Sequence, residues 1–130
     1  MPPSSAGNGT AGRRRILLVD DEQEIIDVLR EYFADVYDVD TAGSASQALE
    51  RVHAQRPDLV FLDINMPGTN GVEALTLIKQ IDETIPVIMA TANTDNGLAA
   101  ESITRGAFSY IPKPFNLKYL DHLIAAAWSR

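Results

Sequence analysis

A short apolar run, Leu59 to Leu62, ends abruptly at Asp63 and is followed by the turn residues Pro67 and Gly68. Four apolar residues are too few for a helix, so the run predicts a buried strand that begins shortly after Pro57. A carboxylate placed where such a strand stops is expected to face a surface cleft. This stretch constrains the fold of the whole chain, because a fully buried strand needs other elements on both of its faces.

Five short apolar or β-branched runs alternate with five stretches of helical periodicity, without repeats or a long linker. The predicted strands are 16–19, 37–41, 59–62, 87–90 and 110–111. This alternation predicts an α/β fold with a parallel sheet covered on both faces, in which 37–41 suits an edge. Helical spacing places Tyr32 in the core-facing stripe of the first helix. The fourth helix, 96–105, offers only Leu98, Ala99 and Ile103 and is expected to be the most weakly anchored.

Length and composition indicate one domain. The 130 residues, 45% of them hydrophobic, suffice for a single core. Residues 1–13, mostly small and polar, are predicted to form a disordered tail, and residues 14–130 the folded domain. The chain has no cysteine and no apolar run of about 20 residues that could span a bilayer, so a cytoplasmic protein without a membrane partner is expected.

The charge of the chain is acidic. It carries 11 basic and 18 acidic residues, and three of the basic ones are the consecutive Arg13, Arg14 and Arg15. These three are best interpreted as a solvated entry into the first strand. The remaining excess of acid argues against direct nucleic-acid binding, which needs a basic stripe.

Polar residues follow four of the five predicted strands. They are Asp20 and Asp21, Asp63, Thr91, and Lys113. Ligands of open parallel sheets bind beyond the carboxyl ends of the strands, so these side chains are expected to meet. Three carboxylates in one cleft repel one another unless a cation neutralises them, and a hard ion with few protein ligands, Mg²⁺, fits best. The main-chain carbonyl of Asn65 is a further candidate ligand. Metal, ammonium and hydroxyl together suit a phosphoryl group.

With these residues in view, the sequence resembles a response-regulator receiver domain of two-component signalling. The likeness runs from Arg15 to about Trp128. It is carried by Asp20-Asp21-Glu22, Asp63-Ile64-Asn65-Met66-Pro67-Gly68, Gly71, Thr91-Ala92, Gly106-Ala107, Tyr110 and Lys113-Pro114. It implies a flavodoxin-like, doubly wound (βα)5 three-layer sandwich, whose five parallel strands have the order 2-1-3-4-5.

The resemblance implies roles for the charged residues. Asp63 resembles the phosphoacceptor, which attacks the phosphorus of a phosphohistidine and becomes an acyl phosphate. Asp20 and Asp21 look like Mg²⁺ ligands beside Asp63 and Asn65. Lys113 is similar to the lysine that pairs with the carboxylate before transfer and with the phosphoryl group afterwards.

The resemblance also implies a switch. Thr91 and the backbone N–H of Ala92 match the position that reports the phosphoryl group, and Tyr110 resembles the aromatic residue that turns inward with the threonine. A tyrosine that only packs beside a strand is the other interpretation of Tyr110. The Lys113–Pro114 peptide bond is expected to be cis. His53 and His122 are interpreted as surface residues.

The expected partners are a sensor histidine kinase or phosphotransfer protein and a downstream effector, with a phosphorylation-dependent homodimer as one form of output. The protein is not expected to be an ordinary enzyme; it takes part in its own Mg²⁺-dependent phosphorylation and dephosphorylation. Asn65 and Asn93 are compatible with a long or a short acyl-phosphate lifetime. Both a stand-alone regulator and the front part of a longer protein fit the chain.

Two other function classes make different demands on the sequence. A receiver-like interaction module that is never phosphorylated would lack an acid, the threonine or the lysine, and none is missing. A flavodoxin-like electron carrier would need a hydroxyl-rich phosphate loop where this chain has Asp20-Asp21-Glu22.

Overall fold

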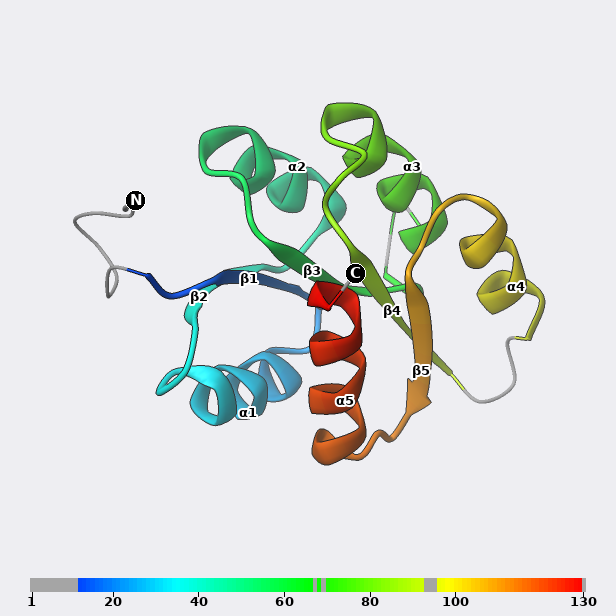
Figure 1. Ribbon diagram of the computed structural model, residues 1–130. Helices are drawn as coiled ribbons and strands as arrows, with labels where there is room; N and C mark the ends of the chain where they lie inside the picture. The colour runs from blue at the N-terminus through cyan, green and yellow to red at the C-terminus, as the bar shows by residue number, and fades with distance from the viewer. Residues whose placement is uncertain (1–11, 67, 69, 93–95, 130) are drawn as a thin grey trace.

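A computed structural model describes residues 12–129 except 67, 69 and 93–95, and it does not describe the side chains of residues 92 and 96. Strands and helices alternate along these residues (Figure 1). The strands are β1 Arg15–Val19, β2 Asp38–Ala42, β3 Leu59–Asp63, β4 Val87–Ala92 and β5 Ser109–Lys113. The helices are α1 Gln23–Phe33, α2 Ala45–Ala54, α3 Gly71–Ile81, α4 Asn96–Thr104 and α5 Leu117–Trp128. Most of the predicted tail, Pro67 and Asn93 lie outside the described residues.

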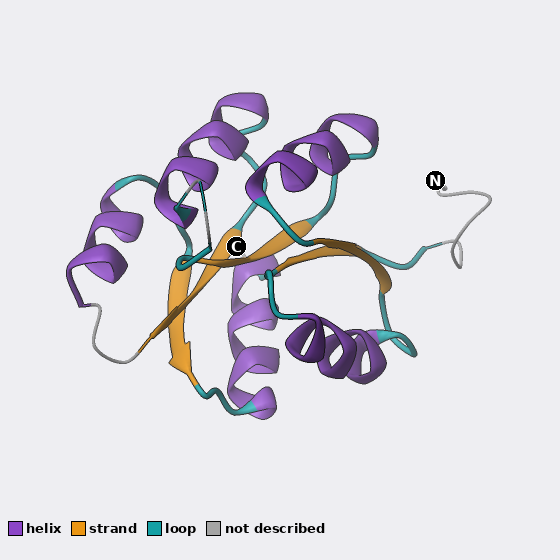
Figure 2. Ribbon diagram, turned by 180° about the vertical axis from the view of Figure 1, so that it is seen from behind, coloured by secondary structure: helices purple, strands orange, loops and turns teal. Residues whose placement is uncertain are grey.

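The strands form one parallel sheet in the order β2-β1-β3-β4-β5, which confirms the expected topology. Helices α1 and α5 cover one face, and α2, α3 and α4 cover the other, so the domain has three layers (Figures 1 and 2). Strand β2 lies at one edge, as predicted. None of the helices within the described part of the chain is long and apolar enough to cross a membrane.

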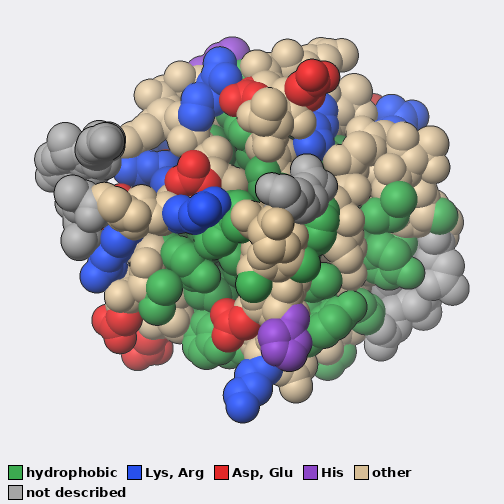
Figure 3. Space-filling view, viewed as in Figure 1, with side chains coloured by type: hydrophobic (Ala, Val, Ile, Leu, Met, Phe, Trp, Pro, Cys, Tyr) green, Lys and Arg blue, Asp and Glu red, His purple; other side chains and the backbone are tan. Residues whose placement is uncertain are grey.

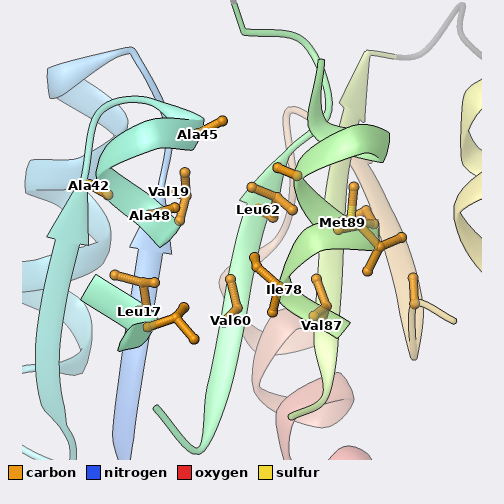
Figure 4. Close-up of a cluster of buried hydrophobic side chains, with 14 of the residues drawn as sticks. Leu17, Val19, Ala42, Ala45, Ala48, Val60, Leu62, Ile78, Val87 and Met89 are labelled. Carbon is orange, nitrogen blue, oxygen red and sulfur yellow. The ribbon is translucent and has the colours of Figure 1, made fainter. Parts of the chain in front are cut away.

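Alternating side chains of the central strands divide the core in two. Leu17 and Val19 point with Val60 and Leu62 toward α2 and α3 (Figure 4). The residues between them in the strands, such as Leu18 and Phe61, pack against α1 and α5. The central strands are therefore buried on both sides, which is why they appear in the sequence as uninterrupted apolar runs.

Strand β5 is longer than predicted. The sequence predicts a strand of residues 110–111 that Pro112 ends. In the structure, pairing continues through Pro112 and Lys113, opposite Thr91 and Ala92 of β4. Strand β5 lies at the edge of the sheet, where the missing N–H of a proline costs no ladder hydrogen bond. The longer strand carries Lys113 to the same level as the end of β4.

Two core predictions were wrong. Tyr32 is exposed: its ring packs edge-on against Phe33, and its hydroxyl donates a 2.6 Å hydrogen bond to Asp121 of α5. Ile103 is 44% exposed, and the neighbouring Ser102 is buried instead, because its hydroxyl can donate to the Leu98 carbonyl at 2.9 Å. A small residue that satisfies its own hydroxyl allows α4 to lie close to the sheet.

The amino ends of β1 and β3 are tied to the end of α5. The Arg14 guanidinium lies 4.5 Å from the centre of the Trp128 ring, and the Trp128 indole N–H donates to the Asp58 carbonyl at 3.1 Å. The Asp58 carboxylate accepts the backbone N–H of Arg15 at 2.7 Å. We call Arg14, Arg15, Asp58 and Trp128 the amino-end cluster.

Candidate functional site

Three carboxylates meet at the carboxyl end of the sheet. Val19 pairs with Leu62, so the residues that follow them in the chain, Asp20 and Asp63, are neighbours. One oxygen from each of Asp20, Asp21 and Asp63 lies within 4.8 Å of the other two. Asp20 and Asp63 are buried and Asp21 is exposed. The predicted convergence of these three acids is confirmed.

The two buried acids are held in the same way. Asp20 Oδ1 accepts the backbone N–H of Glu22 at 2.9 Å, and Asp63 Oδ1 accepts the backbone N–H of Asn65 at 3.0 Å. In both loops the donor lies two residues after the acid, which is the local turn that aspartate favours where a strand ends. The backbone thus fixes both carboxylates through Oδ1, and Oδ2 of each contacts Lys113.

Lys113 joins these second oxygens. Its Nζ lies 3.2 Å from Asp20 Oδ2 and 3.2 Å from Asp63 Oδ2. It also lies 3.5 Å from Glu22 Oε1, a contact that the sequence did not predict. The position of Glu22 directly after the acid pair was the available signal, but spacing alone does not show which way an exposed side chain turns. The Lys113–Pro114 bond is cis, as predicted.

Burial and mutual repulsion make this site electrostatically unusual. Burial, followed by the negative charge of Asp20, raises the pKa of Asp63 from 3.8 to about 6, although the Asn65 N–H and Lys113 oppose the rise. Burial works against the charge of Lys113, but Asp20 and Asp63 outweigh it and raise the pKa of the ammonium. One ammonium therefore does not balance the acids around it.

This donor set suits a hard divalent cation. The converging atoms of Asp20, Asp21 and Asp63 are all carboxylate oxygens, the ligands that Mg²⁺ prefers. The raised pKa of Asp63 indicates a deficit of positive charge that a divalent ion would remove. Asn65, the fourth predicted ligand, contacts Asp63 here through its backbone N–H.

Helix α3 lies directly against Asp63, and Gly71 makes this possible. The Gly71 N–H donates to the Ile64 carbonyl at 2.7 Å. A Cβ atom at this position would collide with the Asp63 carbonyl and the Ile64 Cα. Gly71 is thus required by the close approach of two backbones, whereas Gly68 has a left-handed φ of 88° that suits the predicted turn.

The predicted switch residues lie on the adjacent strands. Thr91 is buried in β4, one residue before the end of the strand and one beyond the pairing of Asp63 with Ala90. Ala92 pairs with Lys113 of β5. Tyr110 is 43% exposed on β5, so its side chain lies outward in this structure. His53 and His122 are exposed, as predicted.

An apolar groove that the sequence did not reveal borders the site. It has a volume of about 640 Å³ and lies between α1 and the segment after β5. Ile25, Val28, Phe115 and Leu117 line it, and Lys113 contributes to its edge. Hydrophobic side chains gather over this side of the molecule in Figure 3. Helical spacing identified Ile25 and Leu117 as apolar positions but could not show that they stay partly uncovered.

Comparison with known proteins agrees with this geometry. Residues 16–125 match the family described as the response regulator receiver domain. The chain is 38% identical over 119 residues to the DNA-binding response regulator MtrA of Mycolicibacterium smegmatis, covering 91% of this chain and 52% of MtrA. It is 41% identical over 104 residues to sporulation initiation phosphotransferase F of Bacillus subtilis, covering 79% and 84%. The chain thus spans about half the length of MtrA.

Solved structures show the same fold. A receiver domain protein from Clostridium thermocellum superposes with a TM-score of 0.84 at 31% identity, covering 90% of this chain and 95% of that one. The receiver domain of NtrX from Brucella abortus gives a TM-score of 0.83 at 34% identity, covering 88% and 98%.

Proposed function

The chain belongs to the response regulator receiver domain family, and from this premise we propose that Asp63 is the residue that accepts the phosphoryl group. Accepting a phosphoryl group in two-component signalling is the function of the family. One observation supports Asp63 above the other acids. Of the three acids, Asp63 is the one on the middle strand of the sheet, where it pairs with Ala90 of β4, next to Thr91, with Lys113 3.2 Å from its Oδ2.

The reaction is a displacement at phosphorus. An oxygen of the Asp63 carboxylate forms a bond to the phosphorus of a phosphohistidine, and the P–N bond breaks with its electron pair remaining on the imidazole nitrogen. Lys113 and Thr91 are proposed to donate to the phosphoryl oxygens, together with the Ala92 backbone N–H. Because the backbone already fixes Asp63, little reorganisation is needed before the attack.

We propose Mg²⁺ as the cofactor, held by Asp20, Asp21 and Asp63, with the carbonyl of Asn65 as a further ligand. When bound, Mg²⁺ stabilises the negative charge of the transferring phosphoryl group. The support for this assignment is the oxygen-only donor set and the raised pKa of Asp63, which Lys113 lowers only in part. In this proposal the chain assists its own phosphorylation and dephosphorylation without turning over a separate substrate.

Phosphorylation is proposed to shift an existing equilibrium between two conformations. The new charge engages Thr91, the outward Tyr110 turns toward the space that Thr91 leaves, and the face formed by α4, β5 and α5 changes shape. An effector or a second copy of the chain would then bind that face. The relatives named as DNA-binding are about twice as long as this chain. For this chain the absence of nucleic-acid binding stays a prediction, and so does a cytoplasmic location.

The phosphodonor is proposed to be a histidine kinase or phosphotransfer protein that docks a helix into the apolar groove. The groove shares Lys113 with the phosphoacceptor site, so a helix bound there can present a phosphohistidine to Asp63. Val28→Glu, at a side chain that is already exposed, should slow transfer from a kinase that phosphorylates the wild type. The same variant should react with acetyl phosphate at the wild-type rate. Equal rates with the kinase would refute the docking site.

The test of the phosphoacceptor uses Mg²⁺ and acetyl phosphate with intact-mass spectrometry. Wild type should gain the mass of one phosphoryl group, and Asp63→Ala should gain none. Asp58→Ala is the matched control, because it removes an acid from the other end of the same stretch of chain. Phosphorylation of Asp63→Ala at the wild-type rate, or none of the wild type with several donors, would refute the assignment.

A further inference from the structure

We propose that Glu22 competes with the incoming phosphoryl group for Lys113: it accepts a hydrogen bond from the Lys113 ammonium until the phosphoryl group replaces it. This inference rests on the proposed role of Asp63 and concerns how Lys113 becomes available there. An ammonium has three N–H donors, and three carboxylates surround this one. Lys113 Nζ lies 3.2 Å from Asp20, 3.2 Å from Asp63 and 3.5 Å from Glu22.

The three acceptors differ in how firmly they are held. The side chains of Asp20 and Asp63 are 0% and 2% exposed, and each is also fixed by a backbone N–H. The side chain of Glu22 is 60% exposed, makes the longest of the three contacts and forms no capping bond with α1. Glu22 is therefore the acceptor that Lys113 can release at the smallest cost.

The arriving phosphoryl group needs this release. It comes from solvent as an anion and must accept a hydrogen bond from Lys113 to be stabilised. Glu22 competes for the same N–H group of Lys113, and its negative charge repels the anionic phosphodonor. The reaction with acetyl phosphate is complete without other reactants: an Asp63 oxygen bonds to phosphorus, the P–O bond to the acetyl group breaks, and acetate leaves with the electron pair.

Glu22→Ala is the direct test, because it deletes the side chain and keeps the backbone N–H that holds Asp20. The rate of Asp63 phosphorylation should be measured against acetyl phosphate concentration at fixed Mg²⁺. We expect half-saturation at about two- to fivefold lower donor concentration with little change in the maximal rate, the size of effect expected from one exposed ion pair. Glu22→Gln keeps the shape of the side chain and loses its charge. Its half-saturating donor concentration should lie between those of Glu22→Ala and wild type.

Glu31→Ala is the matched control, because it removes the same charge from an exposed position of α1. It should leave half-saturation unchanged. An unchanged Glu22→Ala, or one that needs more donor than wild type, would overturn the proposal. A shift of equal size in Glu31→Ala would do the same, since it would show a general effect of net charge.

A second measurement needs no phosphorylation. In the unmodified protein, NMR signals of the Lys113 ammonium should exchange faster with water in Glu22→Ala than in wild type or Glu31→Ala. Unchanged exchange would refute the contact between Glu22 and Lys113 even if Asp63 is phosphorylated as proposed. Faster exchange in a protein that cannot be phosphorylated would instead leave the contact standing and refute the function of Asp63.

Discussion

The two ends of the sheet use charged residues in opposite ways. At the carboxyl end, Asp20 and Asp63 are buried side by side with one ammonium between them. At the amino end, two charged side chains of the amino-end cluster have partners: Arg14 stacks on Trp128, and Asp58 accepts a backbone N–H. The carboxyl end stores unfavourable charge that a ligand can relieve, whereas the amino end holds the elements together. The difference indicates that the groups proposed to react lie at one end of the strands and the stabilising contacts at the other.

The largest effect on stability is expected at Gly71, where α3 packs against the carboxyl end of β3. Gly71→Ala places a Cβ against the Asp63 carbonyl, so the backbone of α3 or β3 must shift, and the free energy of unfolding should fall by about 2–4 kcal/mol. Urea unfolding measures this change. Gly97→Ala, where a Cβ meets open space in α4, is the control and should be neutral or stabilising by up to about 1 kcal/mol. Equal effects of the two substitutions would contradict the close approach.

The amino end is tested by Trp128→Ala. Loss of the indole removes its packing, the stacking of Arg14 and the hydrogen bond to Asp58, so the free energy of unfolding should fall by about 2–3 kcal/mol. The rate of phosphorylation by acetyl phosphate should stay at the wild-type value wherever the variant is folded. A folded variant with slower phosphorylation would break the separation between the two ends.

Asp63→Asn should stabilise the protein, unlike most changes of a buried residue. The pKa of Asp63 is higher in the folded protein than its ordinary value of 3.8, so the folded state holds its proton more tightly and ionisation at neutral pH costs stability. At pH 7 and without Mg²⁺ the gain should be about 1–3 kcal/mol. It should shrink as the pH falls from about 6 to 4 and vanish at still lower pH, where both states are protonated. Asp58→Asn, at the other end, should not stabilise.

The smallest effect is expected at Arg56, beside the amino-end cluster. Its side chain is half exposed and pairs with Asp82 at 3.1 Å, so Arg56→Ala should lower the free energy of unfolding by about 0.5 kcal/mol. The loss should decrease further in high salt. A loss as large as that of Trp128→Ala would show that ion pairs, rather than the indole, hold this end.

The sequence predicted the strands better than the contacts made by exposed side chains. Apolar runs such as Leu59–Leu62 admit only one interpretation once five of them alternate with helices, and their ends brought Asp20, Asp63 and Lys113 together as expected. The errors at Tyr32 and Ile103 arose because helical spacing fixes a direction only to within one neighbouring position. Glu22 was missed for a related reason: its backbone position follows from the sequence, but the direction of an exposed side chain depends on where Lys113 arrives from a distant strand.

Trp128 is the only tryptophan of the chain, and it lies at the end of the sheet away from Asp63. Its intrinsic fluorescence should therefore report on unfolding and on the packing of α5, and change little when Mg²⁺ or beryllium fluoride is added. A titration monitored by tryptophan emission would show almost no change even when the site is saturated. Optical studies of ligand binding to this domain need a second fluorophore, introduced near the carboxyl ends of the strands.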